Sequence, residues 1–331
     1  MQTTETLSIA PMIDWSNTHF RVLMRHLAPK AFLYTEMQTP GAIKHNAARA
    51  LAYDPIEKPV VLQLGSSDEN ALVTSAKQAE ASGFNEINLN LGCPSDRVQA
   101  GCFGAVLMND PKTVAKCIHA MKQAVSIPIT AKVRIGIDEQ DSYTYFSTFV
   151  NQLVDAGADK LIVHARKAWL KGLSPKQNRS IPPIQYDYAY RIKQDFPEIP
   201  VVINGNISTV FEVQSHLQRV DGVMLGRLAC QNPYEISVIH HVLFPEIPQT
   251  SRAGALQKYL THVACAYQDG VPLSVLIKPL LNFTHGLPNA KRWREELAQA
   301  QRNKDIAFID KLQNILAHME NQQQEKLSLL K

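Results

Sequence analysis

Short apolar segments alternate with amphipathic stretches along the first 245 residues or so. The apolar segments are rich in Val, Ile and Leu and nearly continuous, which is typical of parallel strands buried on both faces. We expect strands at 7–13, 31–36, 60–65, 86–92, 129–136, 160–166, 201–207 and 222–227. Helical periodicity predicts helices at 68–82, 111–124, 142–156, 186–195 and 209–218.

Residues with capping chemistry mark the ends of these helices. Candidate caps stand where the helices begin, and their side-chain oxygens can accept from unpaired backbone N–H groups. They are Ser67 or Asp68, Asn109 or Asp110, Asp141 or Ser142, and Ser208. Gly83 and Gly157 follow two of the helices and suit a left-handed C-terminal turn. The pattern therefore predicts repeated strand–helix units.

Two arrangements share this local signature: an open doubly wound sheet and a closed barrel. No Gly-x-Gly-x-x-Gly follows the first strand, where a dinucleotide-binding fold places its phosphate turn. Polar residues and glycines instead gather at the carboxyl ends of nearly all the strands, as in a barrel whose active face is built from every βα loop. We predict an α/β fold, a (β/α)8 TIM barrel.

After residues 245–250 the pattern becomes helical only. Helices are expected at 252–268, 273–283, 288–301 and 304–326, the second of them broken at Pro279. The sequence thus predicts a catalytic barrel over residues 1–245, followed by a small C-terminal all-helical domain over residues 250–331.

The composition excludes some classes of protein. An apolar fraction of 45% is enough for a core, and no apolar run reaches the ~18 residues that a membrane span needs. The five cysteines are an odd number without the spacing of a disulfide framework or a metal site. We therefore expect a cytoplasmic protein without bound metal and without membrane contact.

The net charge of +4 is mild, but its distribution is uneven. One cluster of basic residues comprises Arg166, Lys167, Lys171, Lys176 and Arg179, and a second comprises Lys291, Arg292 and Arg294. A single cluster of this kind is usually a solvated surface, but two of them favour a phosphate-rich partner. Trp293, within the second cluster, is expected to pack in the helical domain.

Strands seven and eight end in residues suited to a phosphate. Barrels commonly bind a phosphate at these two loops, where glycines let backbone N–H groups approach the anion. Asn204, Gly205 and Asn206 follow strand seven, and Gly226 and Arg227 follow strand eight. Turn formation alone would also explain Gly and Asn here. The presence of both loops favours a phosphate site.

Three residues point this phosphate site toward a flavin: Gln63 and His164, at the ends of strands three and six, and Lys132, in the middle of strand five. Gln and Lys can meet the acceptor edge of an isoalloxazine ring. A lysine on a buried strand is costly unless an anion meets it. Lys132 could instead form a Schiff base, as in an aldolase-like barrel.

Cys93 follows strand four, between Gly92 and Pro94. A lone cysteine is more often a buried structural residue, but residues at the carboxyl ends of barrel strands are typically catalytic. We interpret Cys93 as an acid, with Cys102 as the second candidate.

Taken together, these motifs resemble the tRNA-dihydrouridine synthases. The segments that carry the resemblance are 10–12 (APM), 88–94 (NLNLGCP), 101–105 (GCFGA), 131–134 (AKVR), 163–166 (VHAR), 204–207 (NGNI) and 221–227 (DGVMLGR). Residues 164–169 and 179–183 are similar to the bacterial A-type subfamily in particular.

The resemblance implies an FMN enzyme that uses NADPH to reduce the 5,6 double bond of D-loop uridines in tRNA, at positions 20 and 20a for A-type members. It implies that hydride passes from the flavin to C6 of a flipped-out uracil and that Cys93 supplies the C5 proton. Asn90 would hold the uracil or the ribose, and Lys176, Arg179, Arg292 and Arg294 would bind phosphates. The residues that would hold FMN are Pro11, Met12, Ile13, Gln63, Lys132, His164, Asn204, Gly205, Asn206, Gly226 and Arg227. No protein partner is inferred.

Three alternatives stay open. A flavin barrel that acts on a free pyrimidine shares the flavin site but needs neither the basic cluster nor the helical domain. A Schiff-base aldolase would be colourless. An RNA-binding protein without activity leaves Cys93, Lys132 and His164 unexplained.

Overall fold

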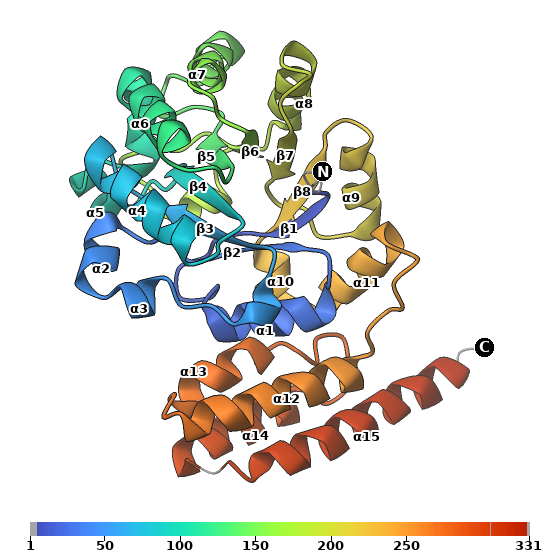
Figure 1. Ribbon diagram of the computed structural model, residues 1–331. Coiled ribbons are helices and arrows are strands. Elements are labelled where there is room, and N and C mark those ends of the chain that lie inside the picture. The colour runs from blue at the N-terminus through green and yellow to red at the C-terminus, as the bar shows by residue number, and fades with distance from the viewer. Residues whose placement is uncertain (1–4, 305, 330–331) are drawn as a thin grey trace. The chain divides into compact units, whose positions relative to one another are not determined.

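The structure, a computed structural model, describes residues 5–304 and 306–329. Within these residues, eight parallel strands close into a barrel in chain order, with β1 hydrogen-bonded to β8 (Figure 1). The predicted TIM barrel is confirmed. The strands are β1 (Leu7–Ile9), β2 (Phe32–Tyr34), β3 (Val60–Leu64), β4 (Glu86–Leu91), β5 (Ile129–Arg134), β6 (Lys160–His164), β7 (Val201–Asn204) and β8 (Gly222–Leu225).

Every strand was predicted at its correct place, but the predicted carboxyl ends were too long. Residues such as Pro11, Gly92 and Gly205 continue the apolar or small pattern of a strand while their backbone already turns away from the ladder. These loop residues include most of the candidate site. Apolar side chains fill the barrel interior, among them Tyr34, Ile162 and Met224.

Helices cover the outside of the barrel between the strands (Figure 1). They are α2 (Pro40–His45), α3 (Ala47–Ala50), α4 (Glu69–Ala81), α5 (Asp96–Ala100), α6 (Pro111–Ala124), α7 (Tyr143–Asp155), α8 (Tyr186–Asp195) and α9 (Val210–Leu217), with short 3-10 turns η1 (Pro55–Glu57), η2 (Gly104–Asn109) and η3 (Gln177–Arg179). Of the neighbouring candidates, Asp68, Asp110 and Ser142 are the residues that cap their helices. The prediction for Ser208 was wrong, because Thr209 forms a capping box with Glu212.

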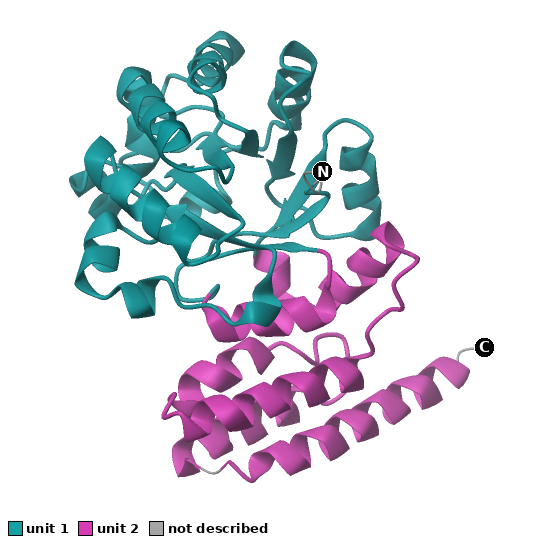
Figure 2. Ribbon diagram, in the orientation of Figure 1, with its two compact units in different colours: residues 1–16, 31–226 teal, residues 17–30, 227–331 magenta. Residues whose placement is uncertain are grey.

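The chain divides into two compact units (Figure 2). The first contains the barrel, with the described residues 5–16 and 31–226; the second contains residues 17–30, 227–304 and 306–329. The helices of the second unit are α1 (Thr18–Leu27), α10 (Arg227–Gln231), α11 (Pro233–Leu243), α12 (Arg252–Gln268), α13 (Leu273–Ile277), η4 (Lys278–Leu280), α14 (Ala290–Asn303) and α15 (Phe308–Ser328). The predicted break at Pro279 is confirmed by the change from α13 to η4.

The units separate between Gly226 and Arg227, earlier in the chain than the boundary of 245–250 expected from the sequence. The difference arises because α11 packs against α1 and α10, and α1 in turn packs against α12. The separate roles expected for the barrel and the helical domain remain predictions. Among the described residues, no helix combines the length and apolar character that crossing a membrane requires.

Candidate active site at the carboxyl ends of the strands

The strand register brings most of the predicted site residues of the barrel into neighbouring positions. Asn90 of β4 pairs with Lys132 of β5, and His164 of β6 pairs with Asn204 of β7. Because all strands are parallel, these residues share the carboxyl end of the barrel. The sequence-based placement of these four residues at one end is therefore correct.

A chain of side-chain amides connects this end to the barrel interior. Nδ2 of Asn90 donates to Oε1 of Gln63 over 2.9 Å, and Nε2 of Gln63 donates to Oδ1 of Asn88 over 2.8 Å. Nδ2 of Asn88 donates to the hydroxyl of Thr130 over 3.0 Å, and that hydroxyl donates to Glu86 over 2.6 Å. Each link has one donor and one acceptor, so the carboxylate of Glu86 fixes the orientation of every amide before it.

Glu86 belongs to a buried polar cluster at the amino ends of the strands. Lys160 forms ion pairs with Glu86 and Glu5, and the hydroxyl of Tyr34 donates to Glu5 over 2.9 Å. Burial raises the pKa of Glu86 and, together with the two carboxylates, raises the pKa of Tyr34 well above its ordinary value. This cluster closes the end of the barrel opposite to the candidate site.

The loop that carries Cys93 is held by backbone contacts. Oδ1 of Asn90 accepts from the backbone N–H of Cys93 over 3.0 Å, and the carbonyl oxygen of Cys93 accepts from the N–H of Ala105 over 2.9 Å. Gly104 has φ +78°, and a Cβ there would lie 2.5 Å from the carbonyl oxygen of Cys93. A glycine is therefore required beside the cysteine loop. Cys93 is partly accessible, and Cys102, the second candidate, is exposed.

Two cations lie close to Cys93. Nζ of Lys132 donates to Oδ1 of Asn204 over 3.0 Å, and burial lowers the pKa of Lys132 to about 7. Burial also lowers the pKa of Arg134 to about 10. Within the described part of the chain, neither residue forms an ion pair with a carboxylate. Buried cations without a counter-ion are costly, so the site is suited to a ligand with negative charge.

The loop after β7 offers a close approach to such a ligand. Gly205 has φ +132°, and a Cβ there would lie 3.0 Å from Cδ2 of His164. Asn206 has φ +54°, and the hydroxyl of Tyr186 donates to the carbonyl oxygen of Gly205 over 2.7 Å. A side chain at position 205 would therefore crowd His164. This narrow, glycine-dependent loop fits the phosphate site predicted there.

The loop after β1 is less crowded than the loop after β7. Met12 packs in part against the barrel core, and Ile13 is exposed. A Cβ at Gly226 would lie 3.6 Å from Cβ of Ala10 and 3.8 Å from Sδ of Met12, in ordinary contact. Arg227 begins α10 and belongs to the second unit.

In the first basic cluster, residues 166–179, some side chains hold the loop together and others are exposed. Lys167 forms an ion pair of 2.8 Å with Asp141, and Arg166 donates to the carbonyl oxygen of Pro182. Lys176 and Arg179 are exposed on and beside η3. The last two therefore remain the candidates for contact with RNA, whereas Arg166 and Lys167 hold the loop together.

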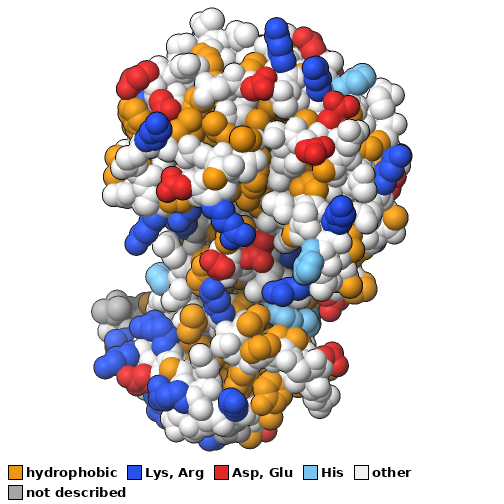
Figure 3. Space-filling view, turned by 90° about the vertical axis from the view of Figure 1, so that its left-hand side faces the viewer, with side chains coloured by type: hydrophobic (Ala, Val, Ile, Leu, Met, Phe, Trp, Pro, Cys, Tyr) orange, Lys and Arg blue, Asp and Glu red, His pale blue; other side chains and the backbone are white. Residues whose placement is uncertain are grey.

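In the second unit, Arg292 and Arg294 are exposed on α14 (Ala290–Asn303). Trp293 between them is fully buried and donates from Nε1 to the carbonyl oxygen of Leu280 over 2.7 Å, so the expectation that it packs is confirmed. Figure 3 shows Lys and Arg side chains gathered on the exposed surface of this unit. The helix thus presents its basic residues outward and its aromatic residue inward.

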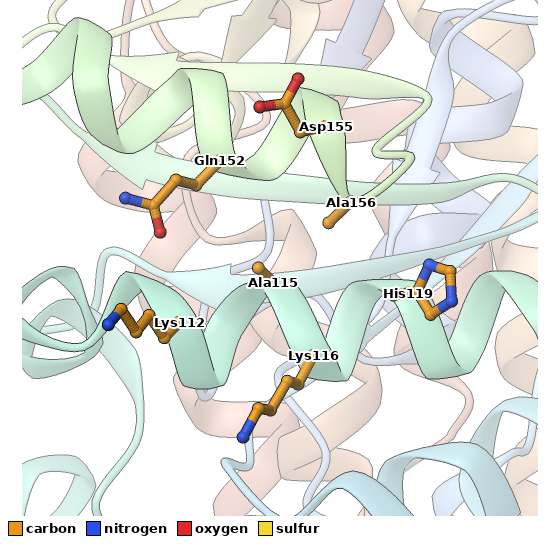
Figure 4. Close-up of a pocket in the computed structure, with 7 residues that line it drawn as sticks. All are labelled: Lys112, Ala115, Lys116, His119, Gln152, Asp155 and Ala156. Carbon is orange, nitrogen blue, oxygen red and sulfur yellow. The ribbon is translucent and has the colours of Figure 1, made fainter.

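A hollow of about 460 Å³ lies on the outer layer of the barrel, between α6 and α7. Figure 4 shows Lys112, Lys116 and His119 on α6, with Gln152 and Asp155 on α7. None of the predicted site residues lines this hollow. Its two lysines lie outside the predicted site, so they provide a control for the basic residues of the candidate site.

Comparison with known proteins identifies the family. The family model for dihydrouridine synthase (Dus) matches residues 8–323 of this chain. The chain belongs to the dihydrouridine synthase family. A protein of Shewanella oneidensis named tRNA-dihydrouridine(20/20a) synthase is 46% identical over 295 residues, which are 89% of this chain and 88% of the relative. A protein of Xanthomonas campestris with the same name is 48% identical over 294 residues, 88% of each chain.

A Vibrio cholerae relative of the same name is 42% identical over 319 residues, which are 96% of this chain and 97% of the relative. A solved 2-naphthoyl-CoA reductase in complex with 2-naphthoyl-CoA has a TM-score of 0.54 at 9% identity, over 72% of this chain and 49% of that chain. At this identity the likeness shows the shared fold alone. Dihydrouridine synthases are flavin-dependent oxidoreductases that reduce uridine to dihydrouridine, so the family agrees with the chemistry predicted for the strand ends.

Four further residues belong to the hydrogen-bond network around the site, although their types and positions in the sequence predicted no role for them: Asn88, Gln99, Arg134 and Asn178. Arg134 had a signal in the sequence, because it lies two residues after Lys132 on the same strand and so on the same face. Asn88 likewise lies two residues before Asn90. Gln99 lies in the short helix α5 and Asn178 in the turn η3, where no strand alternation links them to a predicted site residue.

Proposed function

We propose that this dihydrouridine synthase reduces uridines 20 and 20a in the D-loop of tRNA, with FMN bound at the carboxyl ends of the strands and NADPH as the reductant. The name shared by relatives 42–48% identical over most of the chain supports the substrate. The observation that carries the chemistry is the placement of Cys93 near the buried cation Lys132, at the open end of the barrel. A tRNA substrate agrees with a cytoplasmic location.

The residues present fit FMN. Lys132 and Gln63 would meet the acceptor edge of the ring, with His164 beside them, and the loop of Asn204, Gly205 and Asn206 would hold the phosphate. The further residues proposed for this site are Pro11, Met12, Ile13, Gly226 and Arg227. When bound there, FMN would supply the hydride-transfer chemistry that carries reducing equivalents from NADPH to the 5,6 double bond of uracil.

Cys93 would donate the proton that completes the reduction at C5. A positioned thiol can act as a general acid that gives its proton to a developing carbanion. Asn90 orients the loop through the N–H of Cys93 and would contact the uracil or the ribose. The neighbouring cations Lys132 and Arg134 favour negative charge as it develops on the substrate.

Binding of tRNA would use the exposed basic residues of each unit. Lys176 and Arg179 in the first unit, and Arg292 and Arg294 in the second, are placed on exposed surface where phosphates can reach them. The target uridine must leave its stack to reach the barrel, as bases do in other enzymes that modify them.

The test is an absorbance spectrum of the purified protein, followed by NADPH without air and then by unmodified tRNA. We expect a flavin band that NADPH bleaches and that returns with tRNA but not with free uridine. A transcript with cytidine at positions 20 and 20a is the matched control and should not restore the band. A return with free uridine would favour a reductase of free pyrimidines, and a colourless protein that takes up no FMN would exclude the redox mechanism.

A further inference from the structure

Gln99 joins two loops that have separate roles in the proposed function. The cysteine loop is residues 92–95, and the basic loop is residues 167–180. Nε2 of Gln99 donates to the carbonyl oxygen of Pro94 over 2.9 Å and to that of Leu170 over 2.7 Å. An amide nitrogen carries two hydrogens, so both are used, one for each loop.

Arg134 joins the same two loops from inside the barrel. Nε donates to the carbonyl oxygen of Gly92 over 3.2 Å, whereas Nη1 donates to those of Lys167 over 3.1 Å and Asn178 over 2.9 Å. The residue is 3% exposed and is the last residue of β5 in the barrel. The guanidinium is planar, so its contacts fix the carbonyl groups of both loops relative to each other.

The basic loop is itself held as a unit around Asn178. Oδ1 of Asn178 accepts from the N–H of Trp169 over 2.8 Å, and Nδ2 donates to the carbonyl oxygens of Trp169 and Leu173 over 2.9 and 3.2 Å. Asn178 lies between Lys176 and Arg179 in sequence and is fully buried. A movement of the exposed residues Lys176 and Arg179 would therefore also move the backbone of the basic loop, whose carbonyl groups accept from Gln99 and Arg134.

We propose that Gln99 and Arg134 are positioning residues that couple phosphate binding at the basic loop to the placement of Cys93. This inference rests on the proposed function, since it takes Cys93 as the proton donor and Lys176 and Arg179 as phosphate contacts. It adds that tRNA bound at the basic loop holds the cysteine loop in its reactive position. RNA binding thereby contributes to the rate of proton donation as well as to affinity.

Gln99→Leu is the first test, because it removes both donors at nearly constant size. Two hydrogen bonds of ordinary strength correspond to about a tenfold change in rate if both act in the reacting complex. We expect reoxidation of the reduced flavin by saturating tRNA to slow about tenfold. The Kd for tRNA and the reduction of the flavin by NADPH should change less than about twofold, since neither uses these bonds.

Gln123→Leu is the matched control, the same substitution on the exposed surface of α6. A rate for Gln99→Leu within about twofold of this control would overturn the proposal. Cys93→Ala distinguishes a failure of the coupling from a failure of the proposed role of Cys93. If Cys93→Ala loses product while Gln99→Leu reoxidises its flavin at the control rate, the coupling alone is wrong. If Cys93→Ala keeps full activity, the proposed role of Cys93 is wrong.

A double-mutant cycle with Lys176→Ala tests the coupling itself. In the native background, Lys176→Ala should weaken tRNA binding and also lower the rate at saturating tRNA. In the Gln99→Leu background it should weaken binding only, because the connection is already broken. Effects on the saturated rate that simply multiply would show independent loops and would overturn the proposal.

Hydrogen exchange on the unaltered protein gives a test that needs neither turnover nor a folded variant. The probe is the tRNA transcript with cytidine at positions 20 and 20a. Bound to the protein, it should slow exchange in residues 92–95 as well as in residues 167–180. Protection confined to the basic loop would overturn the coupling.

Discussion

Asn90 and Gln63 share a hydrogen bond of 2.9 Å, in which the Asn90 amide donates to the Gln63 carbonyl oxygen. The bond leaves Oδ1 of Asn90 free to accept from the N–H of Cys93. Reversal of either amide would place two donors or two acceptors together. The position of the cysteine loop therefore depends on an amide orientation that is set deeper in the barrel, at Thr130 and Glu86.

Thr130→Val tests this dependence. The change removes the hydroxyl at constant shape, so Nδ2 of Asn88 loses its acceptor and Glu86 loses a donor in a fully buried place. We expect the free energy of unfolding to fall by about 1–3 kcal/mol, as for other unsatisfied buried groups, measured by urea unfolding. Thr130→Ser keeps the hydroxyl and should retain more of this stability. Equal losses in both variants would mean that packing of the methyl group, and not the hydrogen bond, is responsible.

Cys93→Ala should retain flavin and bind tRNA but lose most dihydrouridine formation. Proton donation by a positioned acid contributes about 10²–10⁴-fold to such reactions, so a loss of at least about a hundredfold is expected. Product is measured by mass spectrometry of nucleosides from the treated tRNA. Cys102→Ala is the control, because Cys102 is exposed on the same segment. A greater loss in Cys102→Ala would transfer the role of acid to that residue.

The strands could be predicted because short segments rich in Val, Ile and Leu alternate with amphipathic helical stretches along the barrel. Their carboxyl ends could not, since Gly92 and Gly205 suit the strand pattern and the loop equally well. The candidate residues Gln63, Lys132, His164 and Asn204 were found from their positions at strand ends. Contacts between segments far apart in the chain could not be predicted, because they depend on how the loops fold. An example is the hydrogen bond from Gln99 to Leu170, which lies 71 positions further along the chain.

The boundary between the units shows a second limit of sequence reasoning. The segment 17–30 belongs by chain order to the first strand–helix unit of the barrel, yet α1 packs with α11 and α12 in the second compact unit. Periodicity shows that a helix has an apolar face but not which partner that face contacts. The sequence therefore located the change to an all-helical pattern and not the division between the units.

Lys176 and Arg179 should contribute to tRNA affinity through a salt-dependent term. Each phosphate contact releases counterions, so loss of one contact lowers the slope of log Kd against log salt concentration by about one. We expect Lys176→Ala and Arg179→Ala to reduce both affinity and slope in filter-binding or fluorescence titrations. Lys112→Ala and Lys116→Ala, at the hollow between α6 and α7, are controls of equal charge change. Equal effects in both pairs would indicate that the general charge of the protein, and not a specific contact, binds the RNA.

Lys132 should make the stability of the flavin-free protein depend on pH. Burial lowers its pKa in the folded state to about 7, whereas its ordinary value is 10.5. Between these values the unfolded chain holds a proton that the folded chain has released, so raising the pH removes a cost of folding. Stability should therefore rise from pH 7 toward pH 10.5 relative to Lys132→Met, which cannot titrate.

The measurement is urea unfolding of both flavin-free proteins across this range, because the difference between them cancels the other titrating groups. A difference that does not change with pH would show that the Lys132 ammonium stays charged in the fold. Added FMN should flatten the rise, since a negative ligand beside Lys132 favours the protonated form. Flattening with FMN but not with riboflavin would place the responsible charge on the phosphate, whereas flattening with both would place it at the ring.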